Sequence, residues 1–283
     1  MPCTWDPVTL GRTGLRVCPL GLASSYGVSG ADVERAVERG VNYLYWGSLR
    51  KADFGRAVAR IARRRREEVV VVVQTYTRIA ALMRPSLERA LRQLGLDHAD
   101  LLLLGWWNRP PSPRVRDAAL ALQAAGRARH IMVSGHHRPT FPTLARDPAL
   151  GAIMVRHNAA HPGAEEEIFP HLAEPRPGVV AYTATRWGTL LDPRLTPPGE
   201  ATPRGSDCYR FVLGNPSVDV VLAGPKDGQE LDEALAALDR GPLGPDEQAW
   251  MRRVGRAVRA ARMAGQARSP VQALGRLVRI LRR

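Results

Sequence analysis

Short apolar runs alternate with amphipathic segments along most of the chain. The runs are rich in valine and leucine and occupy residues 17–22, 41–46, 68–74, 99–105, 130–134, 152–157, 178–182 and 218–223. They are nearly continuously apolar, as expected of parallel strands that are covered on both faces. Segments between them carry apolar residues at helical spacing, and three of these end at Gly40, Gly95 and Gly126. The pattern predicts strands and helices in strict alternation.

A strand followed by a helix, eight times in roughly 250 residues, is the arrangement of a (β/α)8 TIM barrel, an α/β fold. An open doubly wound sheet needs a glycine-rich phosphate loop after its first strand, and residues 24–30 (SSYGVSG) do not fit G-x-G-x-x-G. Residues 8–17 (VTLGRTGLRV) predict a small hairpin that plugs the barrel floor. We therefore predict a barrel over residues 1–250 and a separate tail over 251–283.

Composition places the chain among soluble globular proteins. It has 283 residues, of which 45% are hydrophobic and 24% charged. No window reaches the roughly 18 to 20 apolar residues of a membrane helix, and the start has no signal-peptide core, so we expect a cytoplasmic protein without a transmembrane segment. Cys3, Cys18 and Cys208 are widely spaced and are interpreted as ordinary thiols.

The net charge of +14 is concentrated at the end of the chain. Residues 251–283 contain ten arginines and no acidic residue, so the remaining residues carry only +4. Residues 269–283 predict a basic amphipathic helix, which either packs on the barrel or binds an acidic protein or an anionic membrane surface. No specific nucleic-acid partner is predicted.

Chemistry in such a barrel is expected at the carboxyl ends of the strands, where a small-molecule ligand binds. These ends are aromatic and histidine-rich and carry no acidic residue. The predicted pocket residues are Tyr26, Trp46, Trp106, His136 and His157. No carboxylate lies close to the histidines in sequence, so no metal site is predicted.

Seven motifs in order resemble those of the aldo-keto reductase superfamily over about residues 8–245. The matching segments are LGRTGLRVCPLGL (10–22), GVNYLYWGSLRKADFGRAV (40–58), LDHADLLLLGWW (96–107), AGRARHIMVSG (125–135), VRHNAAHP (155–162), VVAYTATRWGTLL (179–191) and VDVVLAGPKDGQELDEALAAL (218–238). The resemblance implies the same barrel and the reduction of a carbonyl by hydride from NADPH, with a Tyr acid, a Lys, an Asp and a His.

The sequence departs from the family at each of those four positions. Tyr45 stands where the family has Asp, and Tyr76 stands where it has Lys. Gly105 replaces the His, and Leu49 or Arg50 is nearest to the place of the acid Tyr. Tyr45 and Tyr76 are then the candidate catalytic residues, because both would meet at the mouth and either could donate a proton.

The cofactor positions are partly retained. By the resemblance, the residues that would bind NADP(H) are Ser134, Tyr182, Gly224, Lys226 and Glu233. Three further positions depart, with Gly135 in place of Asn, Met154 in place of Gln and Ala234 in place of Asn. The sequence leaves retention and loss of NADP(H) binding open.

The leading interpretation is a barrel of NADP(H)-linked oxidoreductase lineage that has lost the carbonyl-reducing tetrad. It is then a pseudoenzyme or an enzyme with altered chemistry on an apolar or aromatic small molecule. One alternative is a non-redox lyase, isomerase or cyclase that uses a mouth tyrosine or histidine. Another is a ligand-sensing scaffold that acts through the basic tail.

Overall fold

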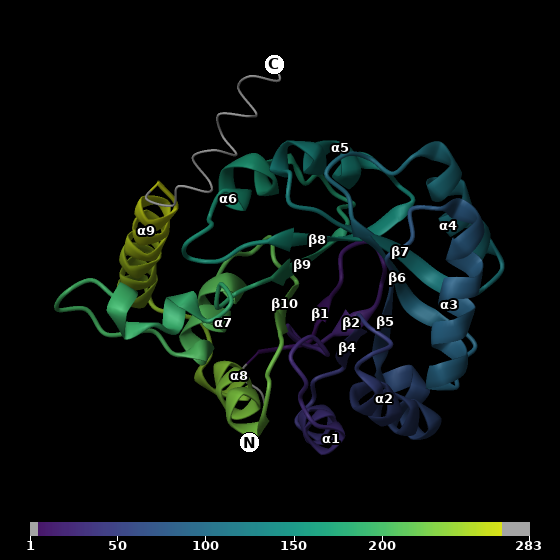
Figure 1. Cartoon of the computed structure of the whole chain (residues 1–283), viewed down its shortest axis with the longest axis horizontal. Helices are drawn as coiled ribbons and strands as arrows, with labels where there is room; N and C mark the ends of the chain where they lie inside the picture. Colours follow the sequence, from purple (N-terminus) through teal and green to yellow (C-terminus); the bar gives the residue numbers. More distant parts are fainter. Residues whose placement is uncertain (1–4, 268–283) are drawn as a thin grey trace.

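Eight parallel strands close into a barrel in the computed structural model, which describes residues 5–267 (Figure 1). Neighbours around the barrel follow the order β10-β3-β4-β5-β6-β7-β8-β9. The strands are β3 (Leu20–Ala23), β4 (Tyr43–Trp46), β5 (Val70–Thr75), β6 (Ala99–Trp106), β7 (Ala128–Ser134), β8 (Leu150–Arg156), β9 (Gly178–Tyr182) and β10 (Val220–Ala223). The predicted (β/α)8 barrel is confirmed, and each strand overlaps one of the eight apolar runs.

Helices surround the strands on the outside (Figure 1). They are α1 (Gly30–Glu38), α2 (Ala52–Arg65), α3 (Ala80–Leu94), α4 (Pro113–Ala124), α5 (Phe141–Arg146), α6 (Ala164–Glu167), α7 (Gly205–Leu213), α8 (Gly228–Arg240) and α9 (Pro245–Ala267). Single 3₁₀ turns occupy Arg66–Glu68, Arg138–Thr140, Phe169–His171, Thr189–Leu191 and Pro193–Leu195. Gly95 ends α3 with φ 64°, a left-handed conformation in which a glycine avoids the Cβ penalty.

The barrel floor is closed by the predicted hairpin. β1 (Val8–Thr9) pairs with β2 (Arg16–Val17) in antiparallel register, and Leu10 and Val17 are buried inside the barrel. Asp219 lies at the same end of the molecule, just before β10, and it accepts two hydrogen bonds from Arg176 at 2.7 and 2.8 Å. The Asp219 carboxylate therefore belongs to the barrel floor and not to the mouth.

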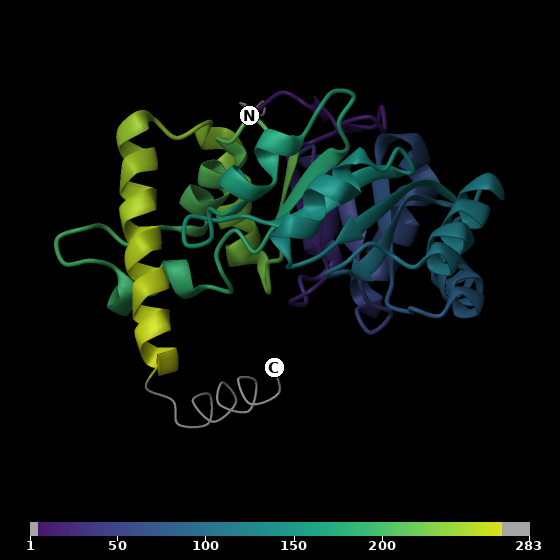
Figure 2. The same cartoon turned by 90° about the horizontal axis from the view of Figure 1, so that it is seen from above.

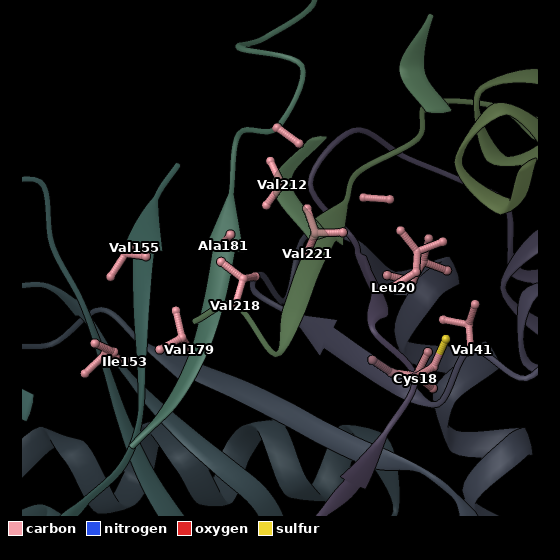
Figure 3. Close-up of a cluster of buried hydrophobic side chains, with 14 of the residues drawn as sticks. Cys18, Leu20, Val41, Ile153, Val155, Val179, Ala181, Val212, Val218 and Val221 are labelled. Carbon is pink, nitrogen blue, oxygen red and sulfur yellow. The ribbon is translucent and has the colours of Figure 1, made fainter. Parts of the chain in front are cut away.

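Residues along each strand alternate between two cores, as the period of two requires. One set fills the barrel, for example Val72, Leu103, Met132, Met154 and Val180. The other set faces the helices, and Figure 3 shows part of it, including Ile153, Val155, Val179 and Val221. Both faces are therefore apolar, which explains the continuous apolar runs in the sequence.

The expected boundary between barrel and tail at residue 250 falls inside α9. This helix lies at the edge of the molecule in both views (Figures 1 and 2) and contacts α7. Met251, Val254 and Val258 of α9 are buried in the core around the barrel. The amphipathic helix predicted for residues 269–283 lies outside the described residues, so its proposed partners stay predictions. Among residues 5–267, no helix is long and apolar enough to cross a membrane.

Candidate functional site

A cavity of about 700 Å³ opens at the carboxyl ends of the strands. Its walls come from strand ends on most sides of the barrel, from the loop after β9, and from the first residues of α7 and α8. Ten of the twelve predicted site residues line it: Tyr26, Tyr45, Tyr76, Trp106, Ser134, His136, Tyr182, Gly224, Lys226 and Glu233. The folded chain thus brings the predicted catalytic, cofactor and most pocket positions to one space.

Trp46 and His157 do not line this cavity, so their assignment to the pocket is wrong. Both are one residue out of phase with the inward positions of their strands. Trp46 follows the inward-facing Tyr45, is 3% exposed and donates from Nε1 to the carbonyl of Lys51 at 3.0 Å. His157 follows Arg156 and is fully buried. Adjacent strand residues point to opposite faces, so both side chains face the surrounding helices.

His157 lies in an aromatic cage on that outer face. Its ring centroid is 5.4 Å from that of Phe169 and 6.1 Å from that of Phe211. Burial, with a smaller contribution from Arg252, lowers the pKa of His157 to about 4, and neither ring nitrogen has a hydrogen-bond partner among the described residues. Nε2 of His157 lies 3.7 Å from Oε1 of Glu165. Because the imidazole is neutral near pH 7, this contact is not an ion pair.

Gln74 and Arg156 also line the cavity, and neither was predicted. Gln74 continues the inward positions Val70 and Val72 on β5. Arg156 continues Met154 on β8. The alternation of side-chain direction along each strand would have predicted both residues. It is a better guide than residue type to which side chains face the mouth.

The two candidate catalytic tyrosines meet inside the cavity. Tyr45 and Tyr76 both line the cavity and each affects the pKa of the other, and the Tyr45 hydroxyl donates to Oε1 of Gln74. Burial is the main cause that raises the pKa of both phenols. No cationic side chain of the described residues contributes to either shift. Both groups are therefore neutral phenols near pH 7, able to donate hydrogen bonds but poorly suited to ionise.

A second polar contact lies at the ends of β7 and β9. The hydroxyl of Tyr182 is 2.9 Å from Nδ1 of His136 and donates to the carbonyl of Gly135 at 3.1 Å. Burial, followed by the charge of Arg156, lowers the pKa of His136. His136 is accordingly neutral near pH 7 and can accept a proton.

Four exposed aromatic side chains converge on the same cavity. Tyr26 is 55% exposed, Tyr76 62%, Trp106 59% and Trp187 54%, and all four line it. They come from four different strand ends and loops. No other aromatic residue is among the exposed large hydrophobic side chains of the described chain. Exposed apolar surface gathered in one concave place is typical of a ligand site.

Strained backbone holds the loop after β9. Thr183, Arg186 and Trp187 have φ values of 61°, 52° and 53°, which non-glycine residues rarely adopt. Buried contacts fix the loop, since Asn158 Nδ2 donates to the carbonyl of Thr183 at 2.9 Å and Arg186 Nε donates to His161 Nε2 at 3.1 Å. The loop thereby places Trp187 over the cavity.

The loop that precedes α8 is occupied by the chain's own carboxylates. Nζ of Lys226 is 2.7 Å from Oε1 of Glu230, and the Lys226 backbone N–H donates to Oε2 of the same residue at 2.9 Å. The hydrogen bond to Glu230 raises the pKa of Lys226, as do the charges of Glu230 and Asp227. Asp227 caps α8 by accepting from the Glu230 backbone N–H at 2.9 Å.

The positions beside Ser134 are short of polar groups. A Cβ at Gly135 would lie 2.3 Å from the carbonyl oxygen of Trp107, so no side chain fits there with this backbone. Met154 occupies the neighbouring inward position on β8. Ser134 is consequently the one side chain with a hydrogen-bonding group at these three positions. Among the described residues, no group of three or more His, Cys, Asp or Glu side chains could hold a metal ion.

The closed parallel barrel with a cavity at its carboxyl end defines a TIM-barrel protein. A profile described as the Aldo/keto reductase family matches residues 23–207, well over half of the chain. The chain therefore belongs to the aldo/keto reductase family. It thus has an NADP(H)-linked oxidoreductase lineage, and NADP(H) is the cofactor that this family generally uses.

Two solved structures of aldo-keto reductase AKR11C1 from Bacillus halodurans are similar to this chain. The holo form is 19% identical with a TM-score of 0.75, and the match covers 89% of this chain and 97% of that one. The apo form is 20% identical with a TM-score of 0.73, covering 89% and 96%. At this level of identity the likeness shows a shared fold.

Proposed function

We propose that this chain binds an aromatic small molecule in the mouth cavity and does not carry out the carbonyl reduction of its family. The observation that carries the proposal is the convergence of Tyr26, Tyr76, Trp106 and Trp187 on one cavity. Leaving four large aromatic side chains half in water costs hydrophobic free energy that a planar ligand would recover on binding. The cavity has room for a ligand of drug-like size.

The groups around Tyr45 support the loss of reductase chemistry. A tyrosine that serves as an acid near neutral pH needs neighbours that lower its pKa. The pKa values of Tyr45 and Tyr76 are raised instead, and the Tyr45 hydroxyl donates its hydrogen bond to the neutral amide oxygen of Gln74. The amide of Gln74 also fills the space beside Gly105, where an added Cβ would lie 3.3 Å from Nε2. The family resemblance places Asp, Lys and His at Tyr45, Tyr76 and Gly105.

The residues at the cofactor positions do not fit NADP(H). A 2'-phosphate needs cationic groups, and the ammonium of Lys226 lies against Glu230 with Asp227 alongside. Like charge on these carboxylates repels a phosphate. A nicotinamide carboxamide needs hydrogen-bonding side chains, and Gly135 and Met154 offer none. Tyr182 and Ser134 remain, but without those groups they provide only a stacking surface and one hydroxyl.

Titration of the purified full-length protein with NADPH and with NADH tests this proposal. Quenching of tryptophan fluorescence reports binding, because Trp106 and Trp187 line the cavity. We expect no saturable binding up to millimolar cofactor, and we expect saturable binding of an aromatic probe such as 2-naphthamide. Micromolar binding of NADPH would overturn the loss of the cofactor, and failure of every aromatic probe would overturn the ligand class.

Non-redox proton transfer is a second candidate, which the Tyr182–His136 contact favours. A neutral imidazole hydrogen-bonded to a phenol can take a proton from a ligand and pass it on. The test is incorporation of deuterium from D2O into a panel of aromatic ketones and acids, followed by mass spectrometry. Exchange that His136→Gln abolishes and the matched His137→Gln variant retains would support it. Exchange absent from the wild-type protein across the panel would count against it.

A further inference from the structure

Arg156 is the last residue of β8 and faces the cavity. It is the register partner of Tyr182 on β9, and both follow the inward positions of their strands. Its guanidinium makes no hydrogen bond or ion pair with any residue that the structure describes. The side chain is partly buried, and its N–H donors that face the cavity are available to a ligand anion.

Two glutamates of α6, the helix that follows β8, are paired with other arginines. Both carboxylate oxygens of Glu165 pair with Arg252 at 3.0 and 3.2 Å. Glu167 accepts from Arg138 at 2.7 Å. The third glutamate of α6, Glu166, is exposed and makes no ion pair with Arg156.

The acids that line the cavity are also engaged, and they follow β10, two strands from β8. Glu230 holds Lys226, while Glu233 accepts from Oγ of Ser206 at 3.2 Å. One side of the cavity therefore carries carboxylates and the other an uncompensated guanidinium. A ligand that is anionic at one end would be oriented by this difference.

The surroundings of Arg156 show the excess of positive charge. Burial lowers the pKa of His161 to about 4, and Arg156 is the first of four arginines that add to this shift. Burial likewise lowers the pKa of Arg186, followed by the charges of Arg262, Arg156 and Arg259. An anion beside Arg156 would relieve this repulsion.

We infer that Arg156 binds the carboxylate of an aromatic carboxylic acid whose ring lies against the aromatic wall of the cavity. The inference rests on the proposed function and names its ligand class. Guanidinium and carboxylate match in a planar, two-bond arrangement. The ring would then extend toward His136 and Trp106, whose ring centroids are 5.5 Å apart. The family resemblance assigns Arg156 neither to the cofactor positions nor to the catalytic tetrad.

The experiment compares three probes of similar ring size on the full-length protein by isothermal titration calorimetry. 2-Naphthoate carries the carboxylate, 2-naphthamide is its neutral counterpart, and 2-naphthyl phosphate offers a different anion. We expect wild-type protein to bind 2-naphthoate about tenfold or more tightly than 2-naphthamide. Arg156→Gln should remove this preference, so that 2-naphthoate binds no more tightly than 2-naphthamide. Arg138→Gln is the matched control, because it removes a nearby arginine that already has a carboxylate partner.

The outcomes separate this inference from the proposed function. Failure of all three probes to bind overturns the aromatic ligand class and with it the inference. Equal binding of 2-naphthoate and 2-naphthamide overturns the role of Arg156 alone. If Arg138→Gln and Arg156→Gln weaken 2-naphthoate binding equally, the preference comes from the general positive charge of this region, and the specific role of Arg156 is overturned. If 2-naphthyl phosphate binds more tightly than 2-naphthoate, the carboxylate class is overturned and the ligand anion is a phosphoester. The wild-type comparison needs no variant, so it holds if Arg156→Gln does not fold.

Discussion

The hydroxyl of Tyr182 lies 2.9 Å from Nδ1 of His136, within hydrogen-bond distance and inside the cavity wall. The phenol has one proton and two neighbours, since the carbonyl of Gly135 is 3.1 Å away. When the phenol donates to Gly135, Nδ1 of His136 must carry the proton and donate to the phenol oxygen. The pair therefore fixes the imidazole tautomer and leaves Nε2 as its acceptor.

Arg156 adjusts the charge state of this pair. Its positive charge is the second cause, after burial, of the lowered pKa of His136. Arg156→Gln should therefore raise the pKa of His136 toward 6.5, which NMR titration of the imidazole C–H signals measures. His98 is the internal control, because burial and the charges of Arg66 and Arg129 lower its pKa. An unchanged pKa of His136 in the variant would show that Arg156 does not act on it.

All six tyrosines of the chain have raised pKa values, with burial as the first cause at each. We expect ultraviolet titration near 295 nm to show no phenolate signal at neutral pH and a midpoint above the ordinary value of 10.0. A reductase-type acid would behave differently, since cationic neighbours lower its pKa. One phenolate appearing near pH 8 in wild-type protein, and absent in Tyr45→Phe, would restore the family's acid to this site. Tyr43→Phe is the matched control, being fully buried outside the cavity.

The sequence predicted the barrel because each apolar run could be buried on both faces only in a covered parallel sheet. It also predicted which segments meet at the mouth, since the carboxyl ends of parallel strands share one edge. Tyr45, Ser134 and Tyr182 line the cavity on this basis. Strand order and direction decide which residues share this edge, and the apolar pattern and the family motifs supply both.

The sequence predicted the direction of side chains at the strand ends less well than it predicted the barrel. Residue chemistry alone predicts Trp46 and His157 as pocket residues, but both side chains face the helices because each lies one residue past an inward position. The inward neighbours are Tyr45 and Arg156. A shift of one residue reverses the face of a strand residue, so the phase must be known exactly where the strand ends. The alternation along strands does not apply to Trp187, which lies in the loop after β9 and is placed over the cavity by its left-handed backbone.

Buried His157 should make the protein sensitive to acid. The pKa of about 4 in the folded state lies below the ordinary 6.5 expected after unfolding, so the unfolded chain binds the proton more tightly. Stability is then fully present above pH 6.5 and is lost as the pH falls toward 4. The loss from this group amounts to about 3 kcal/mol. Urea unfolding at several pH values measures it.

The variant His157→Phe isolates this contribution. Phenylalanine suits the cage of Phe169 and Phe211 and cannot bind a proton. The free energy of unfolding should fall less steeply between neutral pH and about pH 4 than in wild-type protein. The exposed His171 provides the control, and His171→Phe should keep the wild-type slope. Equal slopes in wild type and His157→Phe would show that folding does not lower the pKa of His157.

Relief of strain at Thr183 provides a test of the loop that shapes the cavity. A β-branched residue at φ 61° is held in a left-handed conformation that costs about 1–2 kcal/mol and that glycine adopts freely. The hydrogen bond from Asn158 reaches the Thr183 carbonyl and so survives substitution, whereas the bond that the Thr183 hydroxyl donates to the carbonyl of Tyr182 at 2.7 Å is lost. Thr183→Gly should therefore change the free energy of unfolding little, because the relieved strain offsets the lost hydrogen bond and the larger entropy of the unfolded glycine.

Thr185→Gly is the matched control for that variant. Thr185 lies in the same loop and also lines the cavity, its φ is not positive, and its hydroxyl accepts from the Gly188 N–H at 3.3 Å. Glycine there relieves no strain, loses this hydrogen bond and gains freedom when unfolded, so stability should fall by about 1 kcal/mol. Urea unfolding should thus show a smaller loss of stability for Thr183→Gly than for Thr185→Gly, since each variant loses one side-chain hydrogen bond and only the first relieves strain. An equal or larger loss in Thr183→Gly would mean that the left-handed turn at Thr183 does not hold strain.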